Sequence, residues 1–214
     1  NKKLLEINSQ VYSIIYLMKI KTLVLASSNA HKANEIKMIL GSSYQIKTQQ
    51  EFDVPYVPET GKTFTENAYI KARHLSENIS LPVIADDSGL EVSAINNEPG
   101  IFSARYAYEG ATDGENISKL LSALKNISVS KREAKFICSL AFVDSSTTKK
   151  ASYFIGEWHG VIVNKKKGLH GFGYDPIFFI PSLKKTAAEL TDEVKNKISH
   201  RAIAINKLKY YMES

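Results

Sequence analysis

The sequence predicts an α/β or α+β fold in which helices flank one elongated central sheet. Short apolar runs typical of buried strands are separated by segments whose apolar residues recur every three or four positions, as in amphipathic helices. Two long segments that alternate apolar and polar residues follow in the second half of the chain. With 214 residues, of which 43% are hydrophobic, the chain can bury the core of one domain or of two closely joined lobes.

The first half of the chain begins with a strand, a polar turn and a helix. Residues 21–26 (KTLVLA) predict the strand and residues 27–29 (SSN) the turn. The apolar face of the helix that follows consists of Ile36, Ile39 and Leu40. Thr63 and Glu66 have the spacing of a capping box and predict the start of a second helix. Its apolar face consists of Phe64, Ala68, Ala72 and Leu75.

Acidic residues follow the next apolar run. Residues 82–85 (PVIA) predict a buried strand, residues 86–89 (DDSG) a turn that presents its acids, and residues 90–95 renewed extended structure. A second capping box, at Thr112 and Glu115, predicts another helix. One face of this helix carries Ile117, Leu120, Leu121 and Leu124.

The second half of the chain predicts a long strand pair, a glycine-rich loop and a terminal helix. Residues 134–144 and 152–163 alternate in polarity and are expected to pair as antiparallel neighbours. Glycines in residues 168–176 (GLHGFGYDP) permit close approach of the backbone to a ligand. An apolar run over residues 177–180 and one long helix from about Asp192 complete the pattern.

Charge and cysteine content narrow the class of protein. The net charge of +6 and the pI near 9.2 indicate polyanionic partners, which include both nucleic acids and small phosphorylated ligands. Residues 165–167 (KKK) are the densest basic run and are typical of a solvated turn. The single cysteine, Cys138, lies in an apolar run and has no partner for an internal disulfide. We expect a buried thiol in a reducing compartment and not a catalytic cysteine.

The chain is expected to be a cytoplasmic protein without a membrane span. No stretch approaches the ~20 apolar residues that a spanning helix requires. The start of the chain loosely resembles a signal peptide, but it lacks a small-residue cleavage site before Lys19. We expect Met18 to be the native initiator, residues 1–17 to be a non-native or disordered extension, and residues 18–214 to form the functional domain.

The first candidate for a functional site is the polar loop between the first strand and its helix. Free N–H groups and the macrodipole at a helix N-terminus favour phosphate, and Lys32 adds a full positive charge. Taken alone, the loop is explained better by ordinary helix capping by Ser28 or Asn29. It is not a Walker A loop, because the required glycines are absent. The loop consists of Ser27, Ser28, Asn29, Ala30, His31 and Lys32.

The second candidate is a group of carboxylates, Glu59, Asp86 and Asp87. Mg²⁺ takes oxygen ligands and bridges to substrate phosphates, so acids beside a phosphate site suit this ion. One acid can also deprotonate or orient a water molecule. A common acidic turn is the alternative interpretation of residues 86–89.

The third candidate combines the glycine-rich loop with the terminal helix. Phe172 could stack on a nucleobase while Asp175 and backbone groups meet the polar edge of that base. A structural glycine turn is the alternative. On the helix, Lys195 shares a face with Ser199, whereas His200 and Arg201 point elsewhere unless the helix begins late or breaks. Surface charge is the alternative interpretation of these basic residues.

Seven motifs occur in order between Ser27 and Ala204: SSNAHKANEI, ETGKTFTENAYIKA, ADDSGLEV, PGIFSARYA, GFGYDPIF, KTAAEL and ISHRAIA. On these motifs, the chain resembles the inosine triphosphate pyrophosphatase family, also called the XTP/dITP diphosphatases. The resemblance covers the chain after Met18 and implies an elongated mixed α/β sheet with two lobes enclosing a nucleotide cleft, usually in a homodimer. It also implies Mg²⁺-dependent hydrolysis of ITP, dITP or XTP to the monophosphate and pyrophosphate.

The resemblance further implies roles for individual residues. The loop Ser27–Lys32 would bind the triphosphate, Lys71 would face its phosphates, and Ser88 would contact the substrate. Glu59 and Asp87 would hold the metal, with Asp87 also the general base and Asp86 in a supporting role. The base-binding segment and the residues that close over the nucleotide would be Phe172, Gly173, Tyr174, Asp175, Lys195, His200 and Arg201. Pro58 stands where relatives can carry an additional acid, a departure that concerns metal binding.

Three other functions are compatible with parts of this pattern. A nucleotide-binding regulator would keep the loops but would not need Glu59 and Asp87 to activate water. A nucleic-acid-binding module would suit the positive charge, but the sequence has no aromatic RNA-binding signature and no zinc-ligand spacing. A nucleotide pyrophosphatase with another base preference is the closest enzymatic alternative. We therefore expect small nucleotides as partners, and neither nucleic acid nor membrane.

Overall fold

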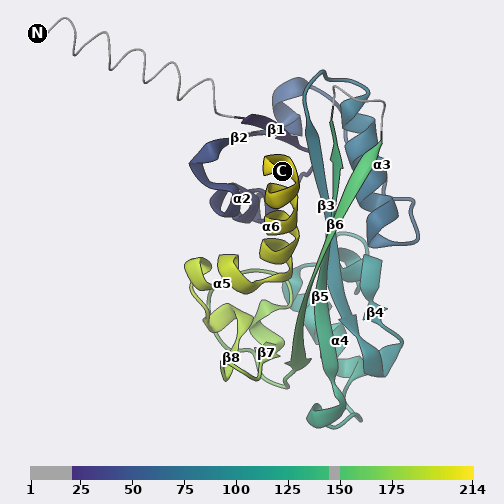
Figure 1. Cartoon of the computed structure of the whole chain (residues 1–214). Helices are drawn as coiled ribbons and strands as arrows, with labels where there is room; N and C mark the ends of the chain where they lie inside the picture. Colours follow the sequence, from purple (N-terminus) through teal and green to yellow (C-terminus); the bar gives the residue numbers. More distant parts are fainter. Residues whose placement is uncertain (1–20, 145–149) are drawn as a thin grey trace, which may run out of the picture.

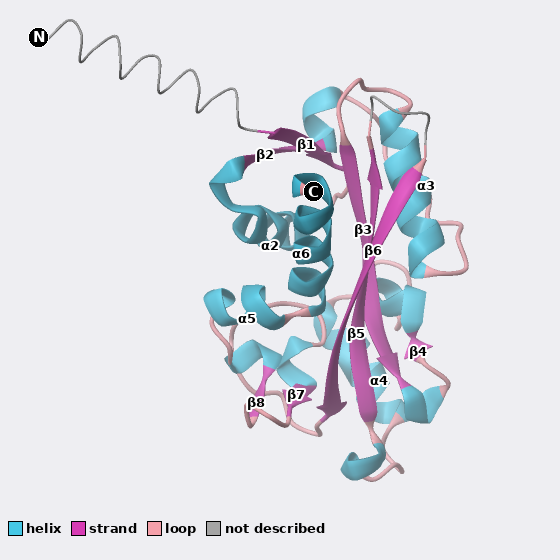
Figure 2. Ribbon diagram, viewed as in Figure 1, coloured by secondary structure: helices cyan, strands magenta, loops and turns pink. Residues whose placement is uncertain are grey.

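The computed structural model describes residues 21–144 and 150–214, which form one mixed sheet flanked by helices (Figures 1 and 2). The strand order is β2-β1-β3-β5-β6-β7-β8, with β4 paired to β3 off this path. The strands are β1 (Lys21–Leu25), β2 (Tyr44–Thr48), β3 (Val83–Val92), β4 (Glu98–Pro99), β5 (Glu133–Val143), β6 (Ala151–Ile162), β7 (Phe178–Ile180) and β8 (Lys185–Thr186). The predicted fold class is confirmed. The expected extension, residues 1–17, and Met18 lie outside the described residues.

The sheet changes character between its two halves. β1 pairs in parallel with both β2 and β3, whereas β3, β5, β6, β7 and β8 pair antiparallel in succession. The expected pairing of the two long segments is confirmed, because β5 and β6 stay in register from Glu133↔Val161 to Val143↔Ala151. β2, a short strand that contains Gln45 and Lys47, was not predicted from its sequence.

Helices cover both faces of the sheet. In Figure 1, α2 and α6 lie on one side of the long strands and α3 lies on the other. Both capping-box positions start helices as predicted, since the hydroxyl oxygens of Thr63 and Thr112 each accept a hydrogen bond from the third helical N–H. The helices are α2 (Ala30–Leu40), α3 (Phe64–Ser76), α4 (Asp113–Ala123), α5 (Asp192–Ile198) and α6 (His200–Glu213).

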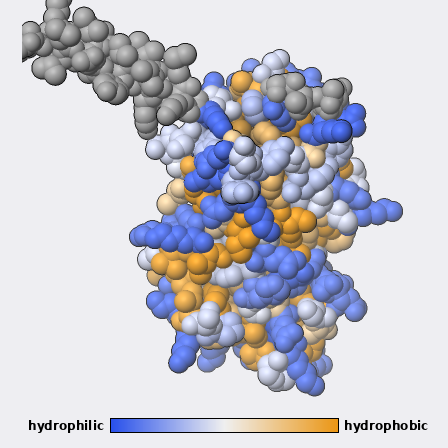
Figure 3. Space-filling model, viewed as in Figure 1, coloured by the Kyte–Doolittle hydropathy of each residue, from blue (hydrophilic) through white to orange (hydrophobic). Residues whose placement is uncertain are grey.

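The core is divided between two lobes that share the long strands. In one lobe, α2 and α6 pack their apolar side chains against one face of β1, β3 and β5, and α3 packs against the other face. In the second lobe, α4 and β7 pack around the opposite ends of β3, β5 and β6. Apolar residues gather around the middle of the face seen in Figure 3, among hydrophilic residues. Across the described residues, no helix combines the length and the apolar character needed to cross a membrane.

The predicted acidic turn over residues 86–89 is wrong, because β3 continues through these residues. Asp86, Asp87 and Ser88 pair with Leu140, Ser139 and Cys138 of β5 without interruption. Gly89 serves close packing and not a turn, since a Cβ atom there would lie 2.6 Å from the carbonyl oxygen of Gly100. The pairing along β5 supplies the backbone hydrogen bonds that a turn would have lost.

The single terminal helix that was predicted is also wrong, because the chain breaks at Ser199. Ser199 has an extended backbone (φ −70°, ψ 164°) and ends α5. Its hydroxyl oxygen accepts a hydrogen bond from the Ala202 N–H, so the same residue caps α6. The break turns His200 and Arg201 inward, where they are 5% and 1% exposed. A break in the helix is the condition under which we expected His200 and Arg201 to lie on the same side as Lys195.

Close contact between β6 and α6 predicts that Gly156→Ala destabilises the protein. A Cβ atom at Gly156 would lie 2.0 Å from the backbone oxygen of His200 and 2.8 Å from the Ala204 nitrogen. Forcing the helix away from the strand should lower the free energy of unfolding by about 1–3 kcal/mol. Urea unfolding measures this change. Gly114→Ala is the matched control, because a Cβ atom there would meet only side-chain atoms at ordinary contact distances, of which Lys166 Nζ at 3.8 Å is the nearest. Equal unfolding midpoints for Gly156→Ala and wild type would contradict the packing.

Candidate active site

The site lies where one edge of β3 is left open. β1 reaches β3 only at Val83 and Ile84, and β4 pairs only with Glu91 and Val92, so no strand covers residues 85–90 on that edge. A cavity of about 420 Å³ opens there. After β1 the chain runs to β2 on one side, and after β2 it crosses back over β1 to β3 on the other side. Such reversals of strand order are common ligand sites in open α/β sheets.

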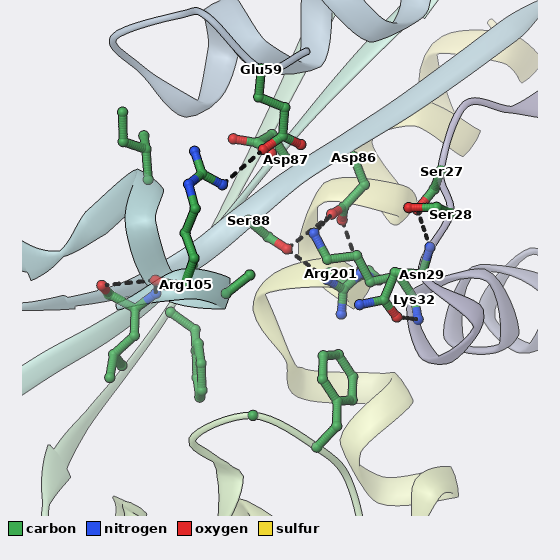
Figure 4. A pocket seen from close by; sticks show the side chains of 18 of the residues that line it. Ser27, Ser28, Asn29, Lys32, Glu59, Asp86, Asp87, Ser88, Arg105 and Arg201 are labelled. Carbon is green, nitrogen blue, oxygen red and sulfur yellow. Dashed lines mark hydrogen bonds and ion pairs between the residues drawn. The ribbon is translucent and has the colours of Figure 1, made fainter. Parts of the chain in front are cut away.

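The two adjacent aspartates of β3 point to opposite faces of the sheet, because side chains alternate along a strand. Asp86 faces α2 and α6, where it meets Lys32 and Arg201. Asp87 faces α3, where it meets Lys71. Both aspartates line the same cavity, since the open edge gives access to both faces (Figure 4).

The loop before α2 combines helix capping with access to the cavity. The Asn29 side chain accepts the Lys32 N–H at 3.0 Å, and Ser27 Oγ accepts the Asn29 N–H at 3.2 Å. The capping interpretation is therefore correct for Asn29. The residues of the predicted loop that line the cavity are Ser27, Ser28, Asn29 and Lys32. Ala30 and His31 are exposed, and the His31 ring stacks on Phe172 with the ring centres 5.3 Å apart.

Asp86 is buried at the centre of a hydrogen-bonded cluster. Its Oδ1 lies 2.7 Å from Lys32 Nζ and accepts a 2.9 Å hydrogen bond from Ser88 Oγ. Its Oδ2 accepts hydrogen bonds from Arg201 Nε at 2.9 Å and Cys138 Sγ at 3.0 Å. Burial raises the pKa of this carboxyl, but the charges of Arg201 and Lys32 outweigh burial and hold it well below the usual value. Both oxygens are occupied by protein donors.

Glu59 and Asp87 converge on the ammonium of Lys71. Lys71 Nζ lies 2.7 Å from Glu59 Oε1, 2.8 Å from Asp87 Oδ1 and 2.9 Å from the backbone oxygen of Asp86. Burial opposes the ionised form of each group. For Glu59 the charge of Lys71 outweighs burial and lowers the pKa, whereas for Asp87 burial prevails and raises it. Burial lowers the pKa of Lys71, but Asp87 and Glu59 raise it further than burial lowers it.

The glycine-rich loop is held in place from below by Asp175, which is 2% exposed. Asp175 Oδ2 accepts the Phe172 N–H at 2.9 Å and lies 2.5 Å from Lys195 Nζ. Gly173 donates its N–H to Asp113, and Tyr174 donates its hydroxyl to the carbonyl of Ser103. The Phe172 ring and the backbone of the glycine-rich loop therefore line the cavity, and the buried Asp175 side chain supports them.

Two basic residues and one histidine complete this end of the cavity. Lys195 Nζ lies 4.9 Å from the centre of the Phe172 ring, and the Arg201 guanidinium lies 5.9 Å from it. Glu35 of α2 forms ion pairs with both cations. His200 stacks on Phe136, and burial, followed by the charge of Arg201, lowers its pKa far below the usual value. Its Nδ1 has no hydrogen-bond partner within the described chain, which marks it as a group available to a ligand.

The structure thus brings together all three candidate groups, and it adds residues for which the sequence suggested no role. Glu35 joins α2 to α5 and α6 through Lys195 and Arg201. Arg105 extends into the cavity from the 3₁₀-helix η4 (Gly100–Arg105). Both lie within recognised motifs, SSNAHKANEI and PGIFSARYA, but one sequence offers no sign of where their side chains point.

The fold and the site define an α/β protein with a charged ligand cavity at the carboxyl end of a parallel strand. The sequence profile of the Ham1 family matches residues 23–211. The chain belongs to this family, which confirms the resemblance seen in the seven motifs.

Curated relatives and solved structures agree with this assignment. The chain is 47% identical over 188 residues to a dITP/XTP pyrophosphatase of Coxiella burnetii, covering 87% of this chain and 94% of the relative. It is 47% identical over 184 residues to the dITP/XTP pyrophosphatase of Yersinia pseudotuberculosis, covering 86% and 93%. The structure of a HAM1 protein from Coxiella burnetii superposes with a TM-score of 0.83 at 44% identity, covering 91% of this chain and 100% of the other. The Staphylococcus aureus Ham1 protein gives a TM-score of 0.80 at 45% identity, with coverages of 90% and 98%.

The buried cluster predicts that Asp86→Asn destabilises the protein in a pH-dependent way. The substitution removes the carboxylate that pairs with Lys32 and leaves Arg201 with Glu35 as its carboxylate partner, so it should cost about 3–5 kcal/mol of unfolding free energy at pH 7. Because the folded pKa of Asp86 lies below its unfolded value of about 3.9, its pairing stabilises the protein above that pH. The stabilisation is lost as the pH falls through the folded pKa.

The difference in unfolding free energy between wild type and Asp86→Asn should therefore be largest above about pH 5 and shrink on acidification. Urea titrations at a series of pH values measure it. Asp53→Asn is the control, because Asp53 is exposed and asparagine also tolerates its left-handed backbone. A difference that is absent at pH 7, or that grows in acid, would contradict the role of Asp86.

Proposed function

We propose that the protein hydrolyses the non-standard purine nucleoside triphosphates ITP, dITP and XTP to the monophosphate and pyrophosphate, and so removes them from the nucleotide pool. The observation that carries this proposal is the convergence of Glu59, Asp87 and Lys71 beside the N-terminal end of α2. This arrangement provides carboxylate oxygens for a metal and cations for a polyphosphate within one cavity. The curated relatives are dITP/XTP pyrophosphatases, which supports the same activity.

The triphosphate would bind at the loop before α2. Helix N-termini favour anions, and Lys32 and Lys71 line the cavity beside this one. A triphosphate carries about four negative charges, which basic residues and a divalent cation together neutralise. The proposed phosphate and substrate contacts are Ser27, Ser28, Asn29, Ala30, His31, Lys32, Lys71 and Ser88.

Glu59 and Asp87 would hold Mg²⁺. Their oxygens already point to one cation, the Lys71 ammonium, at 2.7 and 2.8 Å, so the donor set fits a hard divalent ion. In the described part of the chain, no group of three or more His, Cys, Asp or Glu side chains is arranged to hold a metal. Two carboxylates are nevertheless enough for Mg²⁺, which usually completes its shell with water and substrate phosphates. Bound there, the ion would neutralise charge that develops on the phosphates.

Asp87 is the proposed general base. Burial raises its pKa, which makes the carboxylate a better proton acceptor than an exposed aspartate. Asp87 would take the proton of a water molecule as the water oxygen bonds to the α-phosphorus, and pyrophosphate would leave. Lys71 would neutralise negative charge on the phosphates during this step. No covalent intermediate is required.

The base would bind between the glycine-rich loop and the helices α5 and α6. Lys195 and Arg201 are donors, so they suit the 6-keto oxygen of hypoxanthine or xanthine, whereas a 6-amino group would leave a buried donor unmatched. His200 Nδ1 is a further group that a ligand can satisfy. The proposed contacts are Phe172, Gly173, Tyr174, Asp175, Lys195, His200 and Arg201.

We also propose a cytoplasmic homodimer. The homodimer rests on the family resemblance alone. The single cysteine, Cys138, has a buried thiol that donates to Asp86, which suits a reducing compartment. Small nucleotides remain the expected partners, with neither nucleic acid nor membrane involved.

Hydrolysis of a nucleotide panel tests the function directly. ITP, dITP and XTP should be cleaved in the presence of Mg²⁺ with release of pyrophosphate, and ATP should be cleaved far more slowly because its 6-amino group leaves a donor of the site unmatched. The rate with GTP, which has the 6-keto oxygen, measures the effect of a 2-amino group. Chromatography of the products distinguishes pyrophosphate from orthophosphate. Orthophosphate as the first product, or equal rates for ATP and ITP, would contradict the proposal. The same panel establishes which of the three nucleotides is preferred.

The role of Asp87 predicts that Asp87→Asn lowers kcat by about 10²- to 10⁴-fold, because an amide cannot accept the proton of the attacking water. Steady-state kinetics with ITP at saturating Mg²⁺ measure the loss, and circular dichroism verifies the fold. Asp192→Asn, on the exposed first turn of α5, is the matched control and should retain the wild-type rate. A wild-type rate in Asp87→Asn would reject Asp87 as the base.

A further inference from the structure

Arg105 occupies the side of the cavity opposite the loop before α2. Its helix, η4, is attached to the far end of the open edge of β3, where Ser103 Oγ accepts the Leu90 N–H at 2.8 Å. The buried Asn116 side chain then fixes the chain on both sides of Arg105. It donates to the Ala104 carbonyl at 3.1 Å and accepts the Ala107 N–H at 2.8 Å. The backbone of Arg105 is therefore held in place before any ligand binds.

The guanidinium of Arg105 is only loosely paired. Its nitrogens lie 3.5 Å from Glu59 Oε2 and 3.6 Å from Glu109 Oε2, and it lies 5.5 Å from the centre of the Phe102 ring. The side chain is 24% exposed, and within the described residues its guanidinium makes no hydrogen bond. Contacts at these distances satisfy the charge weakly, because charge-assisted hydrogen bonds are shorter, at about 2.7–2.9 Å.

The other cations of the cavity are bound far more tightly. Lys32, Lys71, Lys195 and Arg201 each lie within 2.9 Å of at least one carboxylate oxygen. Of the cavity cations in the described chain, Arg105 therefore has the guanidinium or ammonium group with the most unused donor capacity. Figure 4 shows that it reaches toward Glu59 and Asp87 from one side, while Asn29 and Lys32 lie on the other side.

We propose that Arg105 is a substrate-binding residue that contacts phosphate oxygens of the nucleotide from the side opposite the α2 loop. This inference rests on the proposed function, because it assigns a further residue of the same site. A guanidinium presents several N–H donors in one plane and can bind two phosphate oxygens at once. The polyphosphate would then be held between cations from both lobes of the protein.

Glu59 links this contact to metal binding. Its Oε1 bonds to Lys71, and its Oε2 is the nearest carboxylate oxygen to Arg105. A divalent ion bound to Glu59 would compete with both cations for these oxygens. Lys71 would then be freed to turn toward the phosphates, whereas Arg105, whose pairing with Glu59 is loose, can reach the phosphates with or without the ion.

The alternative is that Arg105 only positions Glu59 and touches no substrate. The two roles differ in their dependence on metal. A residue that acts through Glu59 would affect phosphate binding only when a divalent ion is present. A residue that contacts phosphate would affect binding in the presence and in the absence of the ion.

Calorimetric titration with inorganic tripolyphosphate distinguishes the two roles. Wild type, Arg105→Gln and Arg73→Gln are each titrated with tripolyphosphate twice, once in the presence of MgCl₂ and once in the presence of EDTA. We expect Arg105→Gln to bind tripolyphosphate on the order of 10- to 100-fold more weakly under both conditions, the loss of one charge-assisted contact. Inosine, which has no phosphate, should bind wild type and Arg105→Gln with equal affinity. Arg73→Gln is the matched control, because Arg73 is exposed on α3 and pairs with Glu77 outside the cavity.

Each other outcome has a definite meaning. Equal tripolyphosphate affinities for Arg105→Gln and wild type overturn the inference. A loss seen only with MgCl₂ also overturns it and assigns Arg105 to holding Glu59. Arg105→Met, which keeps an unbranched side chain without the guanidinium, replaces the glutamine variant if that variant does not fold. Should wild type bind tripolyphosphate yet release no pyrophosphate from any nucleotide, the proposed function fails while the Arg105 comparison still decides the phosphate contact.

Discussion

The site depends on one buried carboxylate, that of Asp86. An ionised aspartate removed from water is strongly unfavourable unless donors surround it. Lys32, Arg201, Ser88 and Cys138 provide those donors from α2, α6, β3 and β5. The carboxylate therefore fixes the relative positions of four elements that are distant in sequence. Because both oxygens of Asp86 already accept hydrogen bonds from the protein, we assign the proposed roles of metal ligand and general base to the neighbouring Asp87.

The second constraint is the gap in strand pairing along β3. β1 pairs with only the first two residues of β3, and β4 pairs with only the last two. The edge of β3 between these two pairings, where both aspartates lie, is therefore open. Gly89 lets η4 approach the strand at the end of that gap, since any side chain there would collide with the Gly100 carbonyl. The cavity is therefore a consequence of strand lengths as well as of the residues that line it.

The charges of the cavity are balanced internally before a ligand binds. Lys71 is shared by Glu59 and Asp87, and Lys195 and Arg201 are joined by Glu35. A ligand must replace these pairs, so it must itself combine negative charge with a means of occupying the carboxylates. A polyphosphate with a divalent cation meets both requirements, which a simple anion does not. Because a ligand must replace ion pairs that already exist, the cavity selects a ligand that carries both kinds of charge and does not bind a single charged group strongly.

The sequence alone determined the family, the fold class, the strand pair β5–β6 and the starts of α3 and α4, because motifs, alternation and capping boxes are local signals. Only the tertiary structure decided that β3 continues through Asp86 and Asp87, that the terminal helix breaks at Ser199, and that Glu35 and Arg105 reach the cavity. Pairing with β5 and burial of Arg201 against Asp86 favour the first two features. These contacts join residues as much as 115 positions apart. No local pattern can encode such contacts, since their energy depends on neighbours that folding itself brings together.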